Sequence, residues 1–367
     1  MKDIFIALIG CGRIAGHHCE AIKETPGIEL LAVCDLDTSK STTYAQKYGV
    51  KQYSNYHQML NDLPQLHVVA VITPSGMHYE HTNDILKRYQ KHVVVEKPTF
   101  LRIQHLRDIS KFATSNSLAV FPVFQNRYNK AVRRVRKAID EHELGEIQIV
   151  NVRVRWCRPQ KYYDLSSWRG TLSHDGGVLS NQGIHHLDLI RYLGGEVESV
   201  QAIMRTFGVK ITAEDTVVGT FTYESGAVGS LEVTTAARPE DFEASLSVIG
   251  SKGFAQIGGI AVNELQVFTP EPEACSQNSV DFLGIEGAGA VYGYGHFDMY
   301  RDIVAHLTGA SEYPIDFSDC MLTLRLLHAF YVSDELGKSV SPKNIDESER
   351  LGIPDEAISD LYRICSE

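Results

Sequence analysis

The chain has 367 residues, of which 43% are hydrophobic and 22% are charged. These values are typical of a globular protein, and the length predicts about two domains. The formal net charge of −11 argues against nucleic acid as a partner, because a phosphate-backbone binder needs a basic face. No run reaches the ~18 apolar residues of a membrane span, so we expect no membrane partner. The seven cysteines form no C-x-x-C pair, which favours reduced thiols and a cytoplasmic protein.

The N-terminal third alternates short apolar runs with helical patterns. We expect strands at 4–9, 30–34, 68–72, 92–95 and 118–123, and helices at 14–23, 39–48, 79–89 and 103–114. Short, continuously apolar strands between helices are typical of a parallel sheet that is covered on both faces. We therefore predict a doubly wound α/β domain over residues 1–124.

The pattern changes after residue 124. A basic helix is expected at 130–143, followed by strands at 148–156, 197–207, 216–223, 227–235, 244–249 and 255–257. Because most of these strands follow one another without helices, we predict an α+β domain with an antiparallel sheet over residues 125–340. Helices at 297–307 and 317–336 are expected to pack back on the structure. The polar tail, residues 341–367, receives no role.

The first strand leads directly into a glycine motif, Gly10-x-Gly12-x-x-Ala15, which opens a helix. Gly10 allows the tight turn, Gly12 lets the backbone approach a pyrophosphate, and Ala15 permits close packing of helix and strand. Asp35 ends the second strand 23 residues after Gly12, where it can bind ribose hydroxyls. Leu36 follows it without a neighbouring arginine for a 2′-phosphate, which favours NAD over NADP. The alternative is a glycine turn in a domain without a ligand.

Two further segments follow strands, at the edge where such sheets bind ligands. They are residues 73–78, which include Thr73, Pro74, Ser75 and His78, and Glu96-Lys97-Pro98. In a cleft, Lys97 can donate a hydrogen bond to a reacting hydroxyl and stabilise the alkoxide. Taken alone, it can equally be a surface lysine that caps a loop.

One predicted helix carries a polar face in an apolar context. Asn181, His185 and Asp188 stand at i, i+4 and i+7, so they share that face. A histidine beside a carboxylate and an amide has the parts of a general base with an orienting partner. The alternative is a core histidine, which is our interpretation of His186. The sequence contains no H-x-x-x-H, so we expect no catalytic metal.

Basic residues gather early in the second domain. Within 43 residues the chain has Arg127, Arg153, Arg155, Arg158, Lys161 and Arg169. Arginine suits carboxylate and phosphate groups. Arg158 and Arg169 lie among Trp156, Tyr162, Tyr163 and Trp168, which favours contact with an anionic ligand. For Arg153 and Arg155, on one face of a strand, a solvated outer surface is the simpler interpretation.

Together these motifs resemble the glucose–fructose oxidoreductase/inositol dehydrogenase (Gfo/Idh/MocA) family. The resemblance rests on Gly10-x-Gly12-x-x-Ala15, Thr73-Pro74-x-x-x-His78, Glu96-Lys97-Pro98 and Gly176-Gly177…His185-x-x-Asp188. It covers about residues 1–340. It implies a Rossmann domain, followed by a domain whose large open antiparallel sheet builds homodimers or homotetramers.

A narrower set of motifs resembles one subfamily, the UDP-N-acetylglucosaminuronate 3-dehydrogenases of bacterial polysaccharide (O-antigen) assembly. The motifs are Gln125-Asn126-Arg127, residues 156–164, Trp168-Arg169-Gly170-Thr171, Asn181-Gln182-x-x-His185, Ala261-Val262-Asn263-Glu264 and Tyr292-Gly293-Tyr294-Gly295-His296. Most of the wider family has aspartate where this chain has Asn181, which concentrates the role of base on His185. The resemblance implies NAD-dependent oxidation of the sugar C3 hydroxyl to a ketone, with the bound NADH reoxidised by 2-oxoglutarate.

The resemblance also implies a set of site residues. Lys97 and His185 would be the catalytic pair. The residues that would bind the cofactor are Gly10, Gly12, Arg13, Ile14, Asp35, Thr73, Pro74, Ser75, His78, Glu96, Lys97, Gln125, Trp168 and Arg169. The residues that would bind the UDP-sugar are Lys97, Arg127, Arg158, Tyr162, Tyr163, Asn181, Gln182, His185, Tyr294 and His296. Two alternatives stay open: a dehydrogenase of another cyclic polyol or sugar, and a regulator that senses dinucleotide without catalysis.

Overall fold

The computed structural model describes residues 4–280 and 294–364, and its first part is built on a six-stranded sheet, here called sheet A. The strand order is β3-β2-β1-β4-β5-β6, and every neighbouring pair is parallel. The strands are β1 (Ile4–Ile9), β2 (Ile28–Cys34), β3 (Lys51–Tyr53), β4 (Val68–Val71), β5 (His92–Val95) and β6 (Val120–Pro122). All four residues of β4 are buried, as expected of a central strand with both faces covered. The predicted doubly wound architecture is confirmed.

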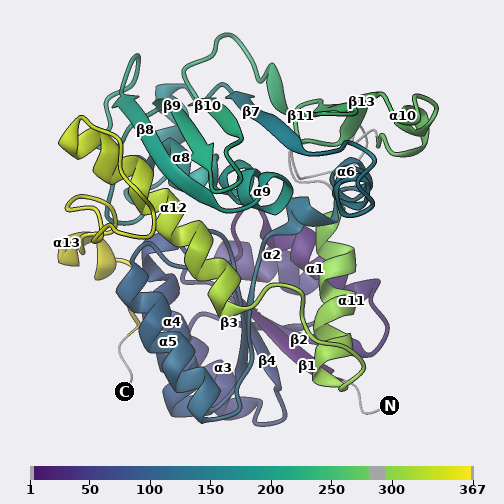
Figure 1. The fold of residues 1–367 in the computed structure, drawn as a ribbon. Coiled ribbons are helices and arrows are strands. Elements are labelled where there is room, and N and C mark those ends of the chain that lie inside the picture. Colours follow the sequence, from purple (N-terminus) through teal and green to yellow (C-terminus); the bar gives the residue numbers. More distant parts are fainter. Residues whose placement is uncertain (1–3, 281–293, 365–367) are drawn as a thin grey trace.

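Helices connect these strands and cover the sheet (Figure 1). They are α1 (Ala15–Lys23), α2 (Thr38–Tyr48), α3 (Tyr56–Asp62), α4 (His78–Asp84) and α5 (Ile103–Ser115). A 3₁₀ turn, η1 (Ser75–Met77), precedes α4, and a π-helical turn, η2 (Ile85–Tyr89), continues it. β3 and α3 were not predicted from the sequence. β3 has three residues and none is buried, so it lacks the apolar run that marked the other strands.

The second sheet, sheet B, has seven strands in the order β13-β12-β11-β7-β10-β9-β8. The strands are β7 (Ile147–Arg155), β8 (Val197–Arg205), β9 (Thr216–Tyr223), β10 (Val228–Thr234), β11 (Glu243–Gly250), β12 (Phe254–Gly258) and β13 (Glu264–Phe268). Of the pairs described, all are antiparallel except β7 with β10, which run parallel. The predicted antiparallel sheet is therefore confirmed, with one parallel pair at its centre that the prediction did not include, and β13 was missed. The β8–β9–β10 meander places β10 next to β7, and these two strands run in the same direction.

Helices from several parts of the chain lie between and beside the two sheets (Figure 1). The second half contains a 3₁₀ turn, η3 (Gln125–Tyr128), and α6 (Lys130–Asp140), α7 (Gln160–Tyr163), α8 (Gly177–Asn181), α9 (Ile184–Gly194), α10 (Ala274–Gln277), α11 (Gly295–Leu307), α12 (Phe317–Leu336) and α13 (Glu356–Ser359). α9 packs on β7 and β11 of sheet B. α12 contacts β8, α9 and α5, and α11 contacts α1, so both late helices join the two halves.

The segment expected to form one helix through residues 181–188 is two helices. α8 ends at Asn181 and α9 begins at Ile184. At the break, the Gly183 amide donates to the Val178 carbonyl, a longer step along the chain than the regular helical bond. The predicted i, i+4 relation between Asn181 and His185 therefore does not describe a continuous helix.

The polar tail is packed against the rest of the molecule. The Arg102 guanidinium donates to the carbonyls of Ser348 and Leu351, at 2.8 and 2.9 Å, and Leu351 is fully buried. The tail then forms α13 and continues to residue 364. Within the described ranges, the cysteines are free thiols and no helix has the length and apolarity needed to cross a bilayer. Cys365, Tyr292 and Gly293 lie outside these ranges.

Candidate active site

The turn between β1 and α1 has the geometry that its glycines were predicted to provide. Gly10 has a φ of 99°, and a Cβ there would lie 2.4 Å from the Ile72 carbonyl oxygen. A Cβ on Gly12 would meet only open space, so this face of the turn is clear for a ligand. α1 has no side-chain cap and no acidic residue in its first turn, so the positive end of the helix dipole faces the turn without a competing carboxylate and suits an anion.

Asp35 lies against this turn. Its carboxylate accepts hydrogen bonds from the Cys11 amide at 2.7 Å and from the Asp37 amide at 2.8 Å. These two bonds fix the carboxylate beside the glycine turn. The remaining lone pairs of its oxygens can accept ribose hydroxyls. Turn, helix and acid together fit a dinucleotide.

A cavity of about 630 Å³, here called the large cavity, opens at this turn. Every residue predicted to bind the cofactor lines it: Gly10, Gly12, Arg13, Ile14, Asp35, Thr73, Pro74, Ser75, His78, Glu96, Lys97, Gln125, Trp168 and Arg169. The buried His78 ring lies 2.9 Å from the Thr73 carbonyl and 2.8 Å from the Pro98 carbonyl, so it braces the loops after β4 and β5. The cavity also has lining residues that were not predicted from the sequence, among them Tyr56, His81, Leu165, Leu361, Tyr362 and Ile364.

A second concavity, here called the small pocket, adjoins the large cavity. It is lined by Arg13, Lys97, Gln125, Asn126, Trp156, Arg158, Tyr162, Asn181, Gln182, His185 and Ala261. Lys97 lines both concavities and therefore stands where they meet. His185 lines only the small pocket of the two.

The Lys97 ammonium is held by the end of α8. Its Nζ donates to the Asn181 carbonyl at 2.8 Å and to Asn181 Oδ1 at 3.2 Å. The Asn181 amide nitrogen in turn donates to the buried carboxylate of Asp175, which fixes the amide with its oxygen toward the lysine. Burial lowers the pKa of Lys97, while the nearby Glu96 and Asp175 carboxylates oppose that shift. Asp175 was not among the predicted site residues. Its carboxylate holds the Asn181 amide, and the Asn181 amide oxygen accepts a hydrogen bond from Lys97.

His185 is 7% exposed, and neither ring nitrogen has a hydrogen-bond partner among the described residues. Burial, and next the positive charge of Lys97, hold the pKa of this histidine well below its usual value. The ring is therefore neutral at pH 7 and can accept a proton. The expected orienting role of Asp188 was wrong, because Asp188 bonds to Arg127 and Thr323.

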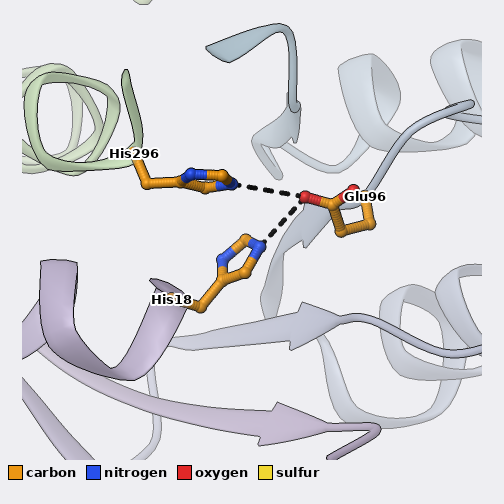
Figure 2. A group of neighbouring side chains, drawn as sticks. All are labelled: His18, Glu96 and His296. Carbon is orange, nitrogen blue, oxygen red and sulfur yellow. Dashed lines mark hydrogen bonds and ion pairs between the residues drawn. The ribbon is translucent and has the colours of Figure 1, made fainter. Parts of the chain in front are cut away.

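Figure 2 shows that His18 and His296 both point to the same oxygen of the Glu96 carboxylate. Glu96 Oε1 accepts from His18 Nε2 at 3.0 Å and lies 3.6 Å from His296 Nε2. Burial alone would raise the pKa of Glu96, but the two histidines hold it well below its usual value. His18 Nδ1 in turn lies 2.7 Å from the Tyr300 hydroxyl. The carboxylate is therefore ionised beside Lys97, and its negative charge opposes the lowering of the lysine pKa by burial.

The same three side chains have the spacing of metal ligands, with candidate ligand atoms within 4.8 Å of one another. Histidine spacing within one helix could not predict this group, because its members come from three separate elements: α1, the end of β5 and α11. The hydrogen bond between His18 and Glu96 pairs two of the three without requiring an ion. The absence of a catalytic metal stays a prediction.

Three arginines surround the Tyr162 ring, between the two concavities. The guanidinium carbon of Arg169 lies 4.5 Å from the ring centroid, that of Arg158 5.6 Å and that of Arg13 5.9 Å. Arg169 donates to the Tyr162 hydroxyl at 2.6 Å, and Arg158 donates to Asp241 at 2.7 Å. With Lys97, these groups make the site locally basic in an acidic chain, and they fit an anionic ligand.

Four residues predicted to bind substrate line neither concavity: Arg127, Tyr163, Tyr294 and His296. Arg127 forms ion pairs with Asp188 at 2.6 Å and with Asp319 at 2.7 Å. The Tyr163 hydroxyl lies 2.9 Å from Thr235 Oγ1.

The strand arginines Arg153 and Arg155 pair with Glu243, and Arg155 also pairs with Glu232. These pairs are consistent with the outer surface that was expected for the two arginines.

The glycine turn, with Asp35 and the uncapped start of α1, defines a protein that uses NAD, and the buried lysine and neutral histidine beside it suit the transfer of a hydroxyl proton. Comparison with known proteins agrees. Residues 4–124 match the family model of the oxidoreductases with an NAD-binding Rossmann fold, and residues 132–256 match the GFO/IDH/MocA C-terminal domain.

Two solved structures resemble the chain over nearly its whole length. The WlbA dehydrogenase from Chromobacterium violaceum, in complex with NADH and UDP-GlcNAcA, is 33% identical, with a TM-score of 0.82 and coverage of 93% of this chain and 96% of its own. The WlbA dehydrogenase from Bordetella pertussis, with the same ligands, is 32% identical, with a TM-score of 0.83 and coverage of 93% and 98%.

The chain is also similar to a dehydrogenase of a cyclic polyol. Myo-inositol 2-dehydrogenase from Thermotoga maritima is 26% identical over 68% of this chain and 73% of its own length. The chain belongs to the Gfo/Idh/MocA oxidoreductase family. It is an NAD-dependent oxidoreductase that acts on the CH–OH group of a sugar or polyol.

Proposed function

We propose that this protein oxidises the C3 hydroxyl of a UDP-linked 2-acetamido-2-deoxy-glucuronic acid to the 3-keto sugar. The observation that carries the proposal is the position of Lys97, which lines both the large cavity and the small pocket. A hydroxyl bound in the small pocket beside His185 would lie next to the dinucleotide site. NAD⁺ bound in the large cavity supplies the hydride acceptor.

His185 acts as the general base in this proposal. Its ring is neutral and its nitrogens have no hydrogen-bond partner among the described residues, so one of them can accept the hydroxyl proton. Burial also means that the proton is transferred away from bulk water. Asp188 does not assist, since its carboxylate is bound to Arg127.

Lys97 stabilises the alkoxide as the hydroxyl loses its proton. Its ammonium is held by two hydrogen bonds to Asn181, and the charges of Glu96 and Asp175 favour its protonated form against the effect of burial. A fixed positive group in a buried site stabilises developing negative charge more than it would in water, because no reorganisation is needed during the reaction. The charges therefore favour the lysine as donor and the histidine as base.

The anionic part of the substrate has a matching surface. Arg13, Arg158 and Arg169 gather around Tyr162, and a UDP-sugar acid carries two phosphates and a carboxylate. A neutral polyol would not need three arginines at the mouth of the pocket. The likeness to two dehydrogenases solved with UDP-GlcNAcA supports the same choice.

A substrate panel tests the proposal. The purified protein is given NAD⁺ with UDP-N-acetylglucosaminuronate, with UDP-N-acetylglucosamine, which lacks the carboxylate, or with myo-inositol, and NADH formation is followed. We expect the highest kcat/KM with the uronate and a loss of at least tenfold without the carboxylate, the effect of losing about 1.4 kcal/mol. Efficient oxidation of myo-inositol with no response to the uronate would replace this proposal with a polyol dehydrogenase.

Three further properties belong to the same proposal. We expect 2-oxoglutarate to reoxidise the bound NADH, with formation of 2-hydroxyglutarate, because the basic groups that suit a uronate also suit a dicarboxylate. We expect a homodimer or homotetramer, because Ile203 and Val218 face each other across β8 and β9 and are 58% and 53% exposed. The free cysteines favour the cytoplasm. Anaerobic mixing of the NADH-loaded protein with 2-oxoglutarate tests the first expectation. Light scattering tests the oligomeric state, and cell fractionation tests the location.

A further inference from the structure

The end of the chain contributes to the wall of the large cavity. Leu361, Tyr362 and Ile364 line it together with Asp35 and the glycine turn, although about 300 residues separate them in the sequence. Leu361 is 59% exposed. Ligand cavities are lined mainly by apolar and aromatic side chains, which the bound ligand covers.

This end is tied to the first half of the molecule. The Arg363 guanidinium binds Glu80 of α4 at 2.6 Å, and it also binds Glu356 and Asp360 of its own segment at 2.6 and 2.7 Å. One turn earlier, Ser359 Oγ lies 3.1 Å from His174 Nε2. Residues 355–364 are therefore bound to Glu80 near their end and to His174 near their middle.

The segment also meets the other covering loop of the cavity. Leu165, Ser166, Trp168 and Arg169 line the cavity from that loop, and Leu165 is 65% exposed. The hydroxyls of Ser167 and Tyr362 lie 3.4 Å apart, so the loop and the C-terminal segment touch. Two exposed leucines, one from each segment, thus border a single cavity.

We propose that residues 355–364, here called the C-terminal segment, are part of the dinucleotide site and slow the release of the bound cofactor. The ligand is a nicotinamide dinucleotide, whose surface would cover the apolar groups that now face water. With the 165–169 loop, the segment forms one part of the wall of the large cavity, and the loops after β4 and β5 line another part. This inference concerns NAD binding alone, so it stands or falls independently of the sugar substrate.

The rate of NADH release tests the inference. The holoenzyme carrying NADH is mixed with excess NAD⁺, and the decay of protein-bound NADH fluorescence is followed for wild type and for the double variant Leu361→Ala/Tyr362→Ala. The matched control is Ile353→Ala, which lies in the same tail and is 46% exposed but does not line the cavity. We expect release from the double variant to be about tenfold faster, which corresponds to about 1.4 kcal/mol. A rate within twofold of the control overturns the proposal.

A second measurement does not depend on any variant. Amide hydrogen exchange of the wild-type protein is compared with and without NAD⁺. We expect slower exchange in residues 355–364 when the dinucleotide is bound, with no change in α10, which lines neither concavity. Unchanged exchange in the C-terminal segment, with protection at the glycine turn, would show that the dinucleotide does not use this wall.

Discussion

The large cavity and the small pocket differ in how their residues come together. The cavity follows the loops at the ends of parallel strands, and all the residues predicted to bind the cofactor line it. The pocket combines residues from the β5, β7, α7 and α8–α9 regions, and four of the residues predicted to bind substrate lie outside both concavities. A site made by backbone turns leaves a contiguous signature in the sequence, whereas a site made by side chains from separate elements does not.

Arg127 illustrates the difference. Its place in a basic stretch, and the resemblance, suggested a contact with an anionic ligand. In the structure, Asp188 and Asp319 neutralise it, and neither acid is near it in the sequence. Charge alone therefore does not distinguish an arginine that binds a ligand from one that binds the protein.

Replacing the base should have the largest effect on turnover. We expect His185→Asn to lower kcat by about 10²–10⁴-fold, the usual contribution of general base catalysis. Because His185 does not line the large cavity, the Kd for NADH should not change. Fluorescence titration and steady-state kinetics measure both quantities. Retained turnover would remove His185 from the mechanism.

Lys97 lies at the junction, so its replacement should affect both regions. We expect Lys97→Met to lower kcat by about 10²–10³-fold, the usual loss of a donor to a developing oxyanion, and to change the Kd for NADH by a few fold. The same two assays apply. Loss of NADH binding without an effect on single-turnover oxidation would limit the lysine to the cofactor.

Arg127 should matter for stability. Arg127→Met leaves the buried Asp188 without its main partner, and we expect the free energy of unfolding to fall by about 3 kcal/mol. Chemical denaturation measures the change. The KM of the sugar substrate should stay within twofold of wild type, and a large increase in KM with unchanged stability would place Arg127 in the substrate site after all.

Arg158 should show the opposite behaviour. We expect Arg158→Met to raise the KM of the UDP-uronate by about tenfold, the loss of one charge-assisted contact. Stability should fall less than in Arg127→Met, because the side chain of Asp241, which pairs with Arg158, is 24% exposed, whereas that of Asp188 is 1% exposed. Comparison with Arg127→Met in the same assays tests the distinction between the two arginines, and equal effects on KM would erase it.

The smallest effect concerns pH near neutrality. Burial lowers the pKa of both His185 and Lys97, so the neutral histidine and the charged lysine coexist over a window displaced to low pH. Activity should rise as pH passes upward through the lowered histidine pKa, well below 6.5, and fall before pH 10.5. Near pH 7 the activity should not depend on pH. A profile of kcat/KM whose acidic limb lies at or above 6.5 would contradict a neutral buried base.

Much of the fold was predictable because β1, β2, β4, β5 and β6 of sheet A contain short apolar runs that alternate with helical patterns. β3 and the parallel pairing of β7 with β10 were not, since an exposed three-residue strand has no periodicity and strand order is decided by tertiary packing. In the site, Asp35 was predictable from its distance to Gly12. Leu361 and Tyr362 were not, because a polar tail gives no signal of where it docks.

The most direct test of the central claim is transfer of the C3 hydrogen. The holoenzyme is mixed with UDP-N-acetylglucosaminuronate that carries deuterium at C3, and the nicotinamide and sugar products are analysed by mass spectrometry. The account predicts NADH that carries one deuterium at C4 and a 3-keto sugar that has lost it, with neither product from His185→Asn on the same timescale. Unlabelled NADH, or no NADH with this sugar while another polyol reduces the cofactor, would contradict it.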